Sequence, residues 1–223
     1  MNELLLVLKE KLKNTFDHPE GHLYKKQASV SIIISQQDSE FKILFIKRVT
    51  HPLDPWSGHM AFPGGHLDIG SENSLEAAMR EAREEVGLNL CQFGEYLGSL
   101  DDFQVHFKGV PQSFIIYPHV FFLNPEAVNQ VVPDESEVAS YFWINLDHFN
   151  QSQNMKPYHY QIGNQVVELP SFEFQEEFIW GITYMIMMDL FQKLEGLKLP
   201  QKKGNLHLQA NHWIHYPLYP AKK

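Results

Sequence analysis

Short apolar runs with the composition of β-strands recur along the chain. Residues 28–34 and 41–48 are rich in Ile and Phe and flank the polar stretch 36–40, so they predict a β-hairpin. Further strand-like runs lie at 93–101, 113–123, 137–144, 156–162 and 165–170. The last two runs are joined by Gly163-Asn164, a pair suited to a hairpin turn. A short strand is also expected at 60–62.

Helical periodicity is confined to a few segments. These segments are residues 2–13, 72–86 and about 175–194. The middle one has the clearest ends: Asn73 and Glu76 fit a capping box, and Gly87 is suited to the C-terminal stop. Strands outnumber helices, and the middle helix interrupts their order. The pattern therefore predicts an α+β fold, a sandwich around a mixed β-sheet.

The same pattern suggests three parts of the chain. We expect an N-terminal helix and linker at 1–26, one large domain at 27–195 and a polar C-terminal extension at 196–223. The longest apolar window, 178–190, has about 13 residues, whereas a spanning helix needs roughly 20. No secretory signal is evident, so we expect a cytoplasmic protein without a membrane anchor. This apolar helix or the C-terminal extension offers a surface for a homodimer.

The middle helix separates two kinds of face when it is drawn at about 100° per residue. The stripe expected to face the core consists of Leu75, Met79, Ala82 and Val86. Glu81, Glu84 and Glu85 lie together on another face. Three carboxylates this close repel one another, and a hard divalent cation would offset that repulsion. A site for Mg²⁺, or for Mn²⁺ in its place, is therefore one interpretation of this face. A solvated acidic face with ion pairs to Arg80 and Arg83 is the other, and the spacing of the glutamates alone favours it.

Composition narrows the classes of ligand. The chain has 18 basic and 27 acidic residues, a formal net charge of −9, which argues against a non-specific nucleic-acid binder. A small anionic ligand is still compatible with this charge, because bound metal ions set the local field. The single cysteine, Cys91, excludes an intrachain disulfide and a zinc site of four thiolates.

The segment around the middle helix resembles the Nudix box, whose pattern is G-x5-E-x7-R-E-U-x-E-E-x-G-U with U aliphatic. The match runs from Glu72 through Arg80-Glu81 and Glu84-Glu85 to Gly87-Leu88. One departure lies upstream: counted from Gly65, Glu72 arrives one residue late. A loop of this length is similar to that of coenzyme A pyrophosphatase-like members of the family.

The resemblance continues outside the box. Residues 55–65, with the sequence PWSGHMAFPGG, are similar to the approach to the box in coenzyme A-type and some nucleoside-diphosphate-sugar-type enzymes. Glu137-Val138 followed by Trp143-Ile144 is similar to a strand of the family, and Trp180-Gly181 resembles the start of its C-terminal helix. The resemblance implies an α/β/α sandwich and a pyrophosphohydrolase, an enzyme that hydrolyses acid anhydrides in phosphorus-containing compounds.

Roles follow from the resemblance residue by residue. Glu81, Glu84 and Glu85 would bind Mg²⁺ together with the backbone carbonyl of Gly65, and Arg80 would brace the carboxylates. The base that activates water would be Glu84 or Glu85, with Glu137 as an external candidate. We read Gly64-Gly65 as a backbone bend beside the metal. The residues considered for substrate contact are Arg48, His59, Phe62, Gly64 and Phe172, although aromatic residues at such places are more often core.

The substrate stays open between two classes at this point. A nucleoside diphosphate linked to a sugar, such as ADP-ribose, is preferred, and the products would be two monophosphates. Coenzyme A or an acyl-CoA is the alternative. It is ranked second because Leu53 stands where such relatives have their second arginine. A non-catalytic nucleotide-binding module on the same fold is a further alternative, against which the intact set of Arg80 and three glutamates argues.

Overall fold

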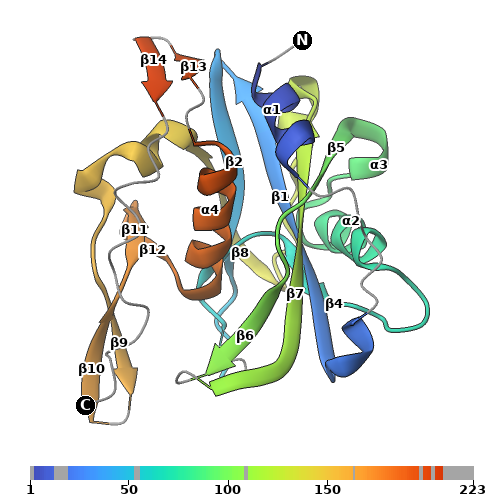
Figure 1. The fold of residues 1–223 in the computed structure, drawn as a ribbon, viewed down its shortest axis with the longest axis vertical. Coiled ribbons are helices and arrows are strands. Elements are labelled where there is room, and N and C mark those ends of the chain that lie inside the picture. The colour runs from blue at the N-terminus through green and yellow to red at the C-terminus, as the bar shows by residue number, and fades with distance from the viewer. Residues whose placement is uncertain are drawn as a thin grey trace.

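The computed structural model describes residues 3–12, 20–52, 56–107, 110–162, 164–195, 198–201 and 204–207. Figure 1 shows a twisted β-sheet with helices on both sides. The helices are α1 (Glu3–Lys11), α2 (Ser74–Val86), α3 (Leu90–Phe93) and α4 (Gly181–Lys193). Short 3-10 helices span Gly21–Leu23, Pro125–Gln130, Leu146–Asn150 and Ser152–Asn154.

The described residues form one large sheet and three separate hairpins. The strands of the large sheet are β1 (Lys26–Gln37), β2 (Glu40–Arg48), β3 (Met60–Ala61), β4 (Gly64–His66), β5 (Gly94–Ser99), β6 (Phe103–Phe107), β7 (Val110–Leu123) and β8 (Val138–Asn145). The hairpins are β9 (Tyr158–Ile162) with β10 (Gln165–Leu169), β11 (Ser171–Phe174) with β12 (Glu177–Trp180), and β13 (Lys198–Gln201) with β14 (Gly204–His207).

The large sheet is mixed. Its main path runs β3-β2-β1-β7-β5, with β4 paired to β1, β6 to β7 and β8 to β2. Strands β1 and β7 are parallel, and the other pairs are antiparallel. The predicted hairpins 28–48 and 156–170 are both present, although Gly163 lies outside the described residues.

Strands β1 and β2 pair only along part of their length. The later part of β1, around Ile34, pairs with β2, whereas its earlier part, around Ser29, pairs with β4. The end of β2, at Ile46 and Lys47, pairs instead with β3. The strands therefore separate toward one end, and the segment that contains Gly64 fills the opening.

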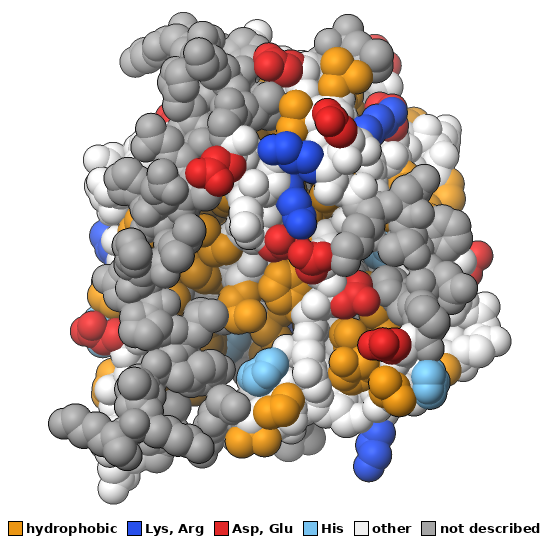
Figure 2. Space-filling model, in the orientation of Figure 1, with side chains coloured by type: hydrophobic (Ala, Val, Ile, Leu, Met, Phe, Trp, Pro, Cys, Tyr) orange, Lys and Arg blue, Asp and Glu red, His pale blue; other side chains and the backbone are white. Residues whose placement is uncertain are grey.

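Two hydrophobic cores lie on the two faces of the sheet. One contains buried residues of α2 with Ile33, Leu44 and Phe121. The other contains residues of α1 and α4 with Ile32 and Phe45. This arrangement confirms the expected α+β sandwich, and it shows that the N-terminal helix packs onto the main domain. Figure 2 shows the surface in the orientation of Figure 1, where basic and acidic side chains lie next to a patch of hydrophobic ones.

Helix α2 is rotated relative to the stripe that its sequence predicts. Ala77, Ala78 and Ala82 are fully buried, whereas Leu75 and Met79 are only partly buried. The cause is close packing on β1, where the Ser29 and Ser31 hydroxyls donate to the carbonyls of Ser74 and Ala78. Only alanine-sized side chains fit between elements at such a separation.

The second half of the predicted helix 175–194 is correct, but its first part is a hairpin. Strand β12 ends at Trp180, and the helix begins at Gly181. The turn before β12 is made by Gln175 and Glu176, which both have positive φ. Gly181 also has a positive φ, of 62°, and open space around its missing Cβ, so it serves the sharp strand-to-helix turn. Strand β6 and helix α3 also lack a counterpart in the sequence-based assignment.

The outer parts of the chain are less fully tested. Strands β13 and β14 place one hairpin in the C-terminal extension, and residues 208–223 lie outside the described part. The expected limits of the domain at 27 and 195 stay predictions. Within the described residues, no helix is long and apolar enough to cross a membrane.

Candidate active site

The predicted ends of α2 are confirmed. The Asn73 side chain accepts from the Glu76 amide at 2.9 Å, and the Glu76 carboxylate accepts from the Asn73 amide at 2.8 Å. Gly87 follows with a left-handed φ of 71°. This capping box satisfies amides that would otherwise lack partners at the helix start, so the register of the following glutamates is fixed.

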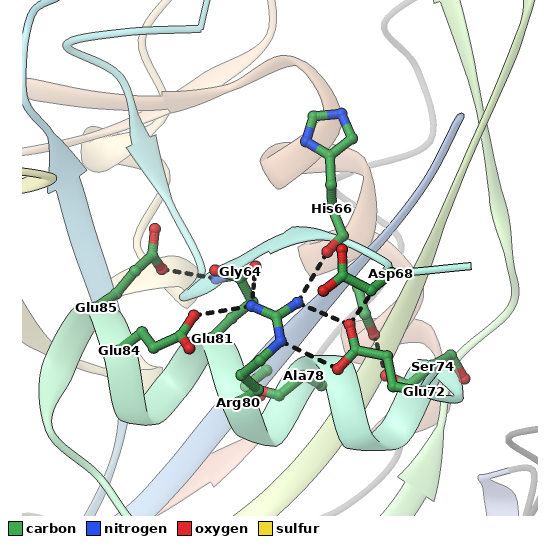
Figure 3. Close-up of polar contacts among 12 residues, drawn as sticks. Gly64, His66, Asp68, Glu72, Ser74, Ala78, Arg80, Glu81, Glu84 and Glu85 are labelled. Atoms are coloured by element: carbon green, nitrogen blue, oxygen red, sulfur yellow. Dashed lines mark hydrogen bonds and ion pairs between the residues drawn. The ribbon is translucent and has the colours of Figure 1, made fainter. Parts of the chain in front are cut away.

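Arg80 connects the loop before α2 to two of its glutamates (Figure 3). Its Nε and Nη2 donate to the two carboxylate oxygens of Glu72 at 3.0 and 2.8 Å. Its Nη1 donates to Glu81 and Glu84, each at 2.8 Å, and Nη2 also donates to the His66 carbonyl at 3.0 Å. The expected bracing role of Arg80 has this geometric basis, and the bidentate partner Glu72 is a residue that the sequence reading did not pair with it.

Glu85 is buried, with 1% of its surface exposed. One carboxylate oxygen accepts from the Gly64 amide at 2.8 Å, and the other lies 3.5 Å from Nη1 of Arg48. Burial raises the pKa of Glu85 to about 8, against the effects of Gly64 and Arg48, and the charges of Glu81 and Glu137 raise it further. A carboxyl group in this position favours additional positive charge beside it.

Glu81 is held between Arg80 and the backbone of Gly65. Burial raises the pKa of Glu81, the hydrogen bond from Arg80 opposes this, and the charges of Glu84 and Glu137 add to the rise. A Cβ on Gly65 would lie 2.4 Å from Oε1 of Glu81. The glycine therefore leaves room for a carboxylate against the main chain. Glu84 differs in being about half exposed, with 52% of its side chain accessible.

The stability of the metal-free protein should depend on pH through Glu85. The folded pKa is about 8 and the ordinary value is 4.5, so the folded state binds more protons between these values. The stabilisation is complete below about pH 4.5 and is lost as the pH rises through about 8. We expect the melting temperature in chelator to fall over this range in wild type and to fall less in Glu85→Gln. Parallel curves for the two proteins would contradict this assignment.

Gly64 and Gly65 form the short strand β4, so the expected backbone bend is wrong. They pair with Val30 and Ser29 of β1. A Cβ on Gly64 would lie 2.4 Å from the Ser29 carbonyl oxygen and 2.7 Å from the Val30 Cα. Close approach of two backbones, not a special φ, therefore requires glycine at 64.

The two glycines should respond differently to alanine. Gly64→Ala is expected to destabilise the fold by about 1–3 kcal/mol, because the new methyl group meets backbone atoms. Gly65→Ala displaces only the Glu81 carboxylate, so we expect near-normal stability and an activity about 10- to 100-fold lower. Chemical denaturation and initial rates measure both effects. Full activity in Gly65→Ala, or wild-type stability in Gly64→Ala, would disprove the respective role.

Arg48 and Glu137 lie next to each other at the ends of β2 and β8. The amide of Val49 donates to the Glu137 carbonyl at 2.9 Å, and Glu137 is exposed. On the other side, the Arg48 amide donates to the His59 carbonyl at 3.1 Å. These contacts bring Arg48, Glu137 and His59 to the same end of the sheet as the α2 glutamates.

Two candidates for substrate contact lie in the hydrophobic core instead. Phe62 is 2% exposed and stacks on Phe45 with ring centroids 4.9 Å apart. Phe172 is fully buried against Phe149, with centroids 5.0 Å apart. Both rings therefore pack within the core, and contact between either of them and substrate stays a prediction that this burial does not support.

The donor chemistry of the site fits a divalent cation. Mg²⁺ prefers carboxylate and carbonyl oxygens, which Glu81, Glu84, Glu85 and the Gly65 main chain supply. The buried Glu85 and the glycine beside Glu81 are the features that a bound cation would explain. In the present side-chain conformation, no three acidic, histidine or cysteine groups among the described residues converge closely enough to hold an ion. Arg80 instead holds Glu81 and Glu84.

Comparison with known proteins agrees with the geometry. Residues 25–166, more than half of the chain, match the model of the NUDIX domain. The peroxisomal coenzyme A diphosphatase ndx-8 of Caenorhabditis elegans is 30% identical over 200 residues, covering 87% of this chain and 78% of the relative. The mitochondrial coenzyme A diphosphatase NUDT8 of Homo sapiens is 28% identical over 166 residues, covering 73% of this chain.

The chain spans about two thirds of the human relative's length, 67%. Among solved structures, an Ap4A hydrolase of C. elegans in a binary complex aligns with a TM-score of 0.45 and 21% identity. That alignment covers 55% of this chain and 81% of the other. The family match, together with the arrangement of Arg80 and the glutamates that the box-like segment predicts, leads to one conclusion: this chain belongs to the Nudix family.

Proposed function

We propose that this protein hydrolyses the diphosphate linkage of a nucleoside diphosphate joined to another group, with Mg²⁺ or Mn²⁺ as its cofactor. The observation that carries the proposal is the Arg80 network. A single guanidinium orients Glu81 and Glu84 while Glu85 is fixed by the Gly64 amide. A nucleotide-binding module without catalysis has no use for three oriented carboxylates, so this geometry favours the enzyme.

The residues that would hold the metal differ in exposure. Glu81 and Glu85 are mostly buried, and with the exposed Glu84 and the Gly65 carbonyl they would supply the oxygen ligands. When bound, the metal would neutralise phosphate oxygens and lower the pKa of water.

A base must instead reach a water molecule with a free oxygen. Glu84 and Glu137 are exposed and meet this requirement better than Glu85, whose oxygens face Gly64 and Arg48. Arg48, whose guanidinium lies 3.5 Å from Glu85, would be suited to contact a phosphate oxygen. The products would be two monophosphates.

Coenzyme A or a thioester of it becomes the preferred substrate. Two similar relatives bear the name coenzyme A diphosphatase, and one of them covers most of this chain. ADP-ribose, which the sequence reading preferred, is the second candidate because Leu53 stands where an arginine is expected in coenzyme A-type relatives. Residue 53 lies outside the described part of the chain, so the choice depends on measurement. A cytoplasmic location and a homodimer stay predictions.

The substrate is best assigned with a panel of coenzyme A, acetyl-CoA, ADP-ribose and a dinucleoside polyphosphate. Initial rates at equal Mg²⁺ give kcat/KM for each compound. We expect the coenzyme A compounds to have the highest value. A clear preference for ADP-ribose would restore the nucleotide sugar. Turnover of none, with nucleotide binding retained, would favour the non-catalytic module.

A further inference from the structure

A group of partly exposed aromatic side chains lies beside the catalytic residues. Its members are His59, Tyr158, Tyr160, Phe178 and Trp180, which we call the surface aromatic cluster. The rings of Tyr158 and Trp180 are stacked, with centroids 4.3 Å apart and planes 16° apart. His59 meets Trp180 edge-on at 4.7 Å, and Tyr160 lies 5.1 Å from it. Phe178 packs on Tyr158 at 5.6 Å.

Strand geometry brings these rings together. On β12, Ile179 is fully buried, so its neighbours Phe178 and Trp180 extend to the opposite face. On β9, Tyr158 and Tyr160 are two residues apart and share a face. Figure 1 shows the β9–β10 hairpin projecting from the body of the protein, next to β11 and β12. The tyrosines of the projecting hairpin therefore meet the outward rings of β12.

This cluster differs from the aromatic residues of the core. Phe149 and Phe172 are fully buried, whereas all five rings of the surface aromatic cluster are partly exposed. Leaving apolar surface in water costs about 25 cal/mol per Å². A contiguous group of partly exposed aromatic rings beside polar residues is therefore a candidate for a binding surface.

Two contacts connect the cluster to the catalytic residues. The His59 carbonyl accepts from the amide of Arg48, and the Arg48 guanidinium lies 3.5 Å from Glu85. Lys47, beside Arg48, forms an ion pair with Glu177 at the start of β12. Both the histidine and the strand that ends in Trp180 are thus attached to the end of β2 that reaches the glutamates.

The chemistry of the cluster indicates what it binds. Its members are flat, and all except Phe178 carry a polar nitrogen or oxygen at the ring edge. Flat π faces stack on a heteroaromatic base, and the polar edges can meet the nitrogen atoms of that base. An acyl or pantetheine chain would suit aliphatic walls better. We propose that the surface aromatic cluster binds the base of the nucleoside part of the substrate, an assignment that rests on the proposed function of the neighbouring site.

The test uses two small probes and the full-length protein. AMP carries a base, and ribose 5-phosphate has the same sugar phosphate without one. Neither compound contains a diphosphate, so their binding is measured without hydrolysis. Calorimetric titration in Mg²⁺ should show tighter binding of AMP. Tyr160→Leu and Trp180→Leu should each weaken AMP binding by about 5- to 150-fold, the range for losing one base–aromatic stack. Binding of ribose 5-phosphate should be unchanged, and Trp180→Phe should recover most of the AMP affinity.

Tyr141→Leu is the matched control, because Tyr141 is an exposed tyrosine on β8 outside the cluster. Equal affinities for the two probes in wild type would overturn the proposal, as would an unchanged ratio of the AMP and ribose 5-phosphate affinities in Tyr160→Leu.

Sedimentation of Tyr160→Leu adds a check. If the variant dissociates from a dimer and this ratio of affinities is unchanged, the β9–β10 hairpin is a dimer contact and not a base site. Hydrolysis of diphosphates without a preference for AMP would support the proposed function and disprove the base site. A preference for AMP without hydrolysis would support the base site and disprove the proposed function.

Discussion

Glu85→Gln should lower kcat/KM by about 10²- to 10⁴-fold, because a bound metal contributes several kcal/mol and each 1.36 kcal/mol is tenfold in rate. Glutamine keeps the shape and can still accept from the Gly64 amide, but it removes the buried charge that would hold the cation. The metal-free variant should fold normally and be more stable than wild type near pH 8, because the protein no longer has to bury a carboxylate there.

Glu76→Gln on the same helix is the matched control for this loss. Glutamine at this position preserves a capping box, so rate and stability should stay close to wild type. Isothermal titration with Mn²⁺ separates binding from chemistry: Glu85→Gln should bind the ion weakly or not at all. Normal metal affinity and rate in Glu85→Gln would remove Glu85 from the site.

Arg80→Ala should affect both stability and activity. The arginine makes five hydrogen bonds, and its loss leaves the mostly buried Glu72 and Glu81 without their cation. Breaking a buried pair costs about 3–5 kcal/mol, and partial exposure of Arg80 reduces this to about 2–3 kcal/mol. For a chain of this size the melting temperature should fall by about 4–12 °C.

The activity of Arg80→Ala should be about 10- to 100-fold lower than that of wild type, because Glu81 and Glu84 lose the group that orients them. Arg80→Lys should recover only part of either loss, since an ammonium group cannot contact both oxygens of Glu72 in the same way. Arg83→Ala, an exposed arginine on the same helix, is the control and should change little. Wild-type stability and rate in Arg80→Ala would show that the network is incidental.

Local sequence signals predicted the parts of this site that depend on neighbours along the chain. The capping residues Asn73 and Glu76, the stop at Gly87 and the clustering of the glutamates all follow from helical spacing. The rotation of α2 could not be predicted in this way. A helical wheel places Leu75 toward the core, whereas close packing on β1 buries the alanines instead. Which apolar residues face the core depends on how near the partner sheet lies, and a helical wheel does not contain that distance.

Contacts between distant segments account for the remaining differences. Phe62, which follows β3, and Phe172, on β11, were considered for substrate contact, yet both are buried in the core. The surface aromatic cluster joins residues around 59, 160 and 180, and its formation depends on the β11–β12 turn that the helix assignment overlooked. Its strand residues were therefore absent from the candidates, although His59 was among them.

Phosphorus NMR of the reaction tests the central claim most directly. Coenzyme A and ADP-ribose are each incubated with wild-type protein in Mg²⁺, in chelator, and with Glu85→Gln in Mg²⁺. The account predicts that the diphosphate signals are replaced by those of two monophosphates for at least one substrate, and only with wild type and Mg²⁺. Unchanged diphosphate signals for both substrates, equal turnover in chelator, or release of inorganic phosphate in place of two monophosphate esters would contradict it.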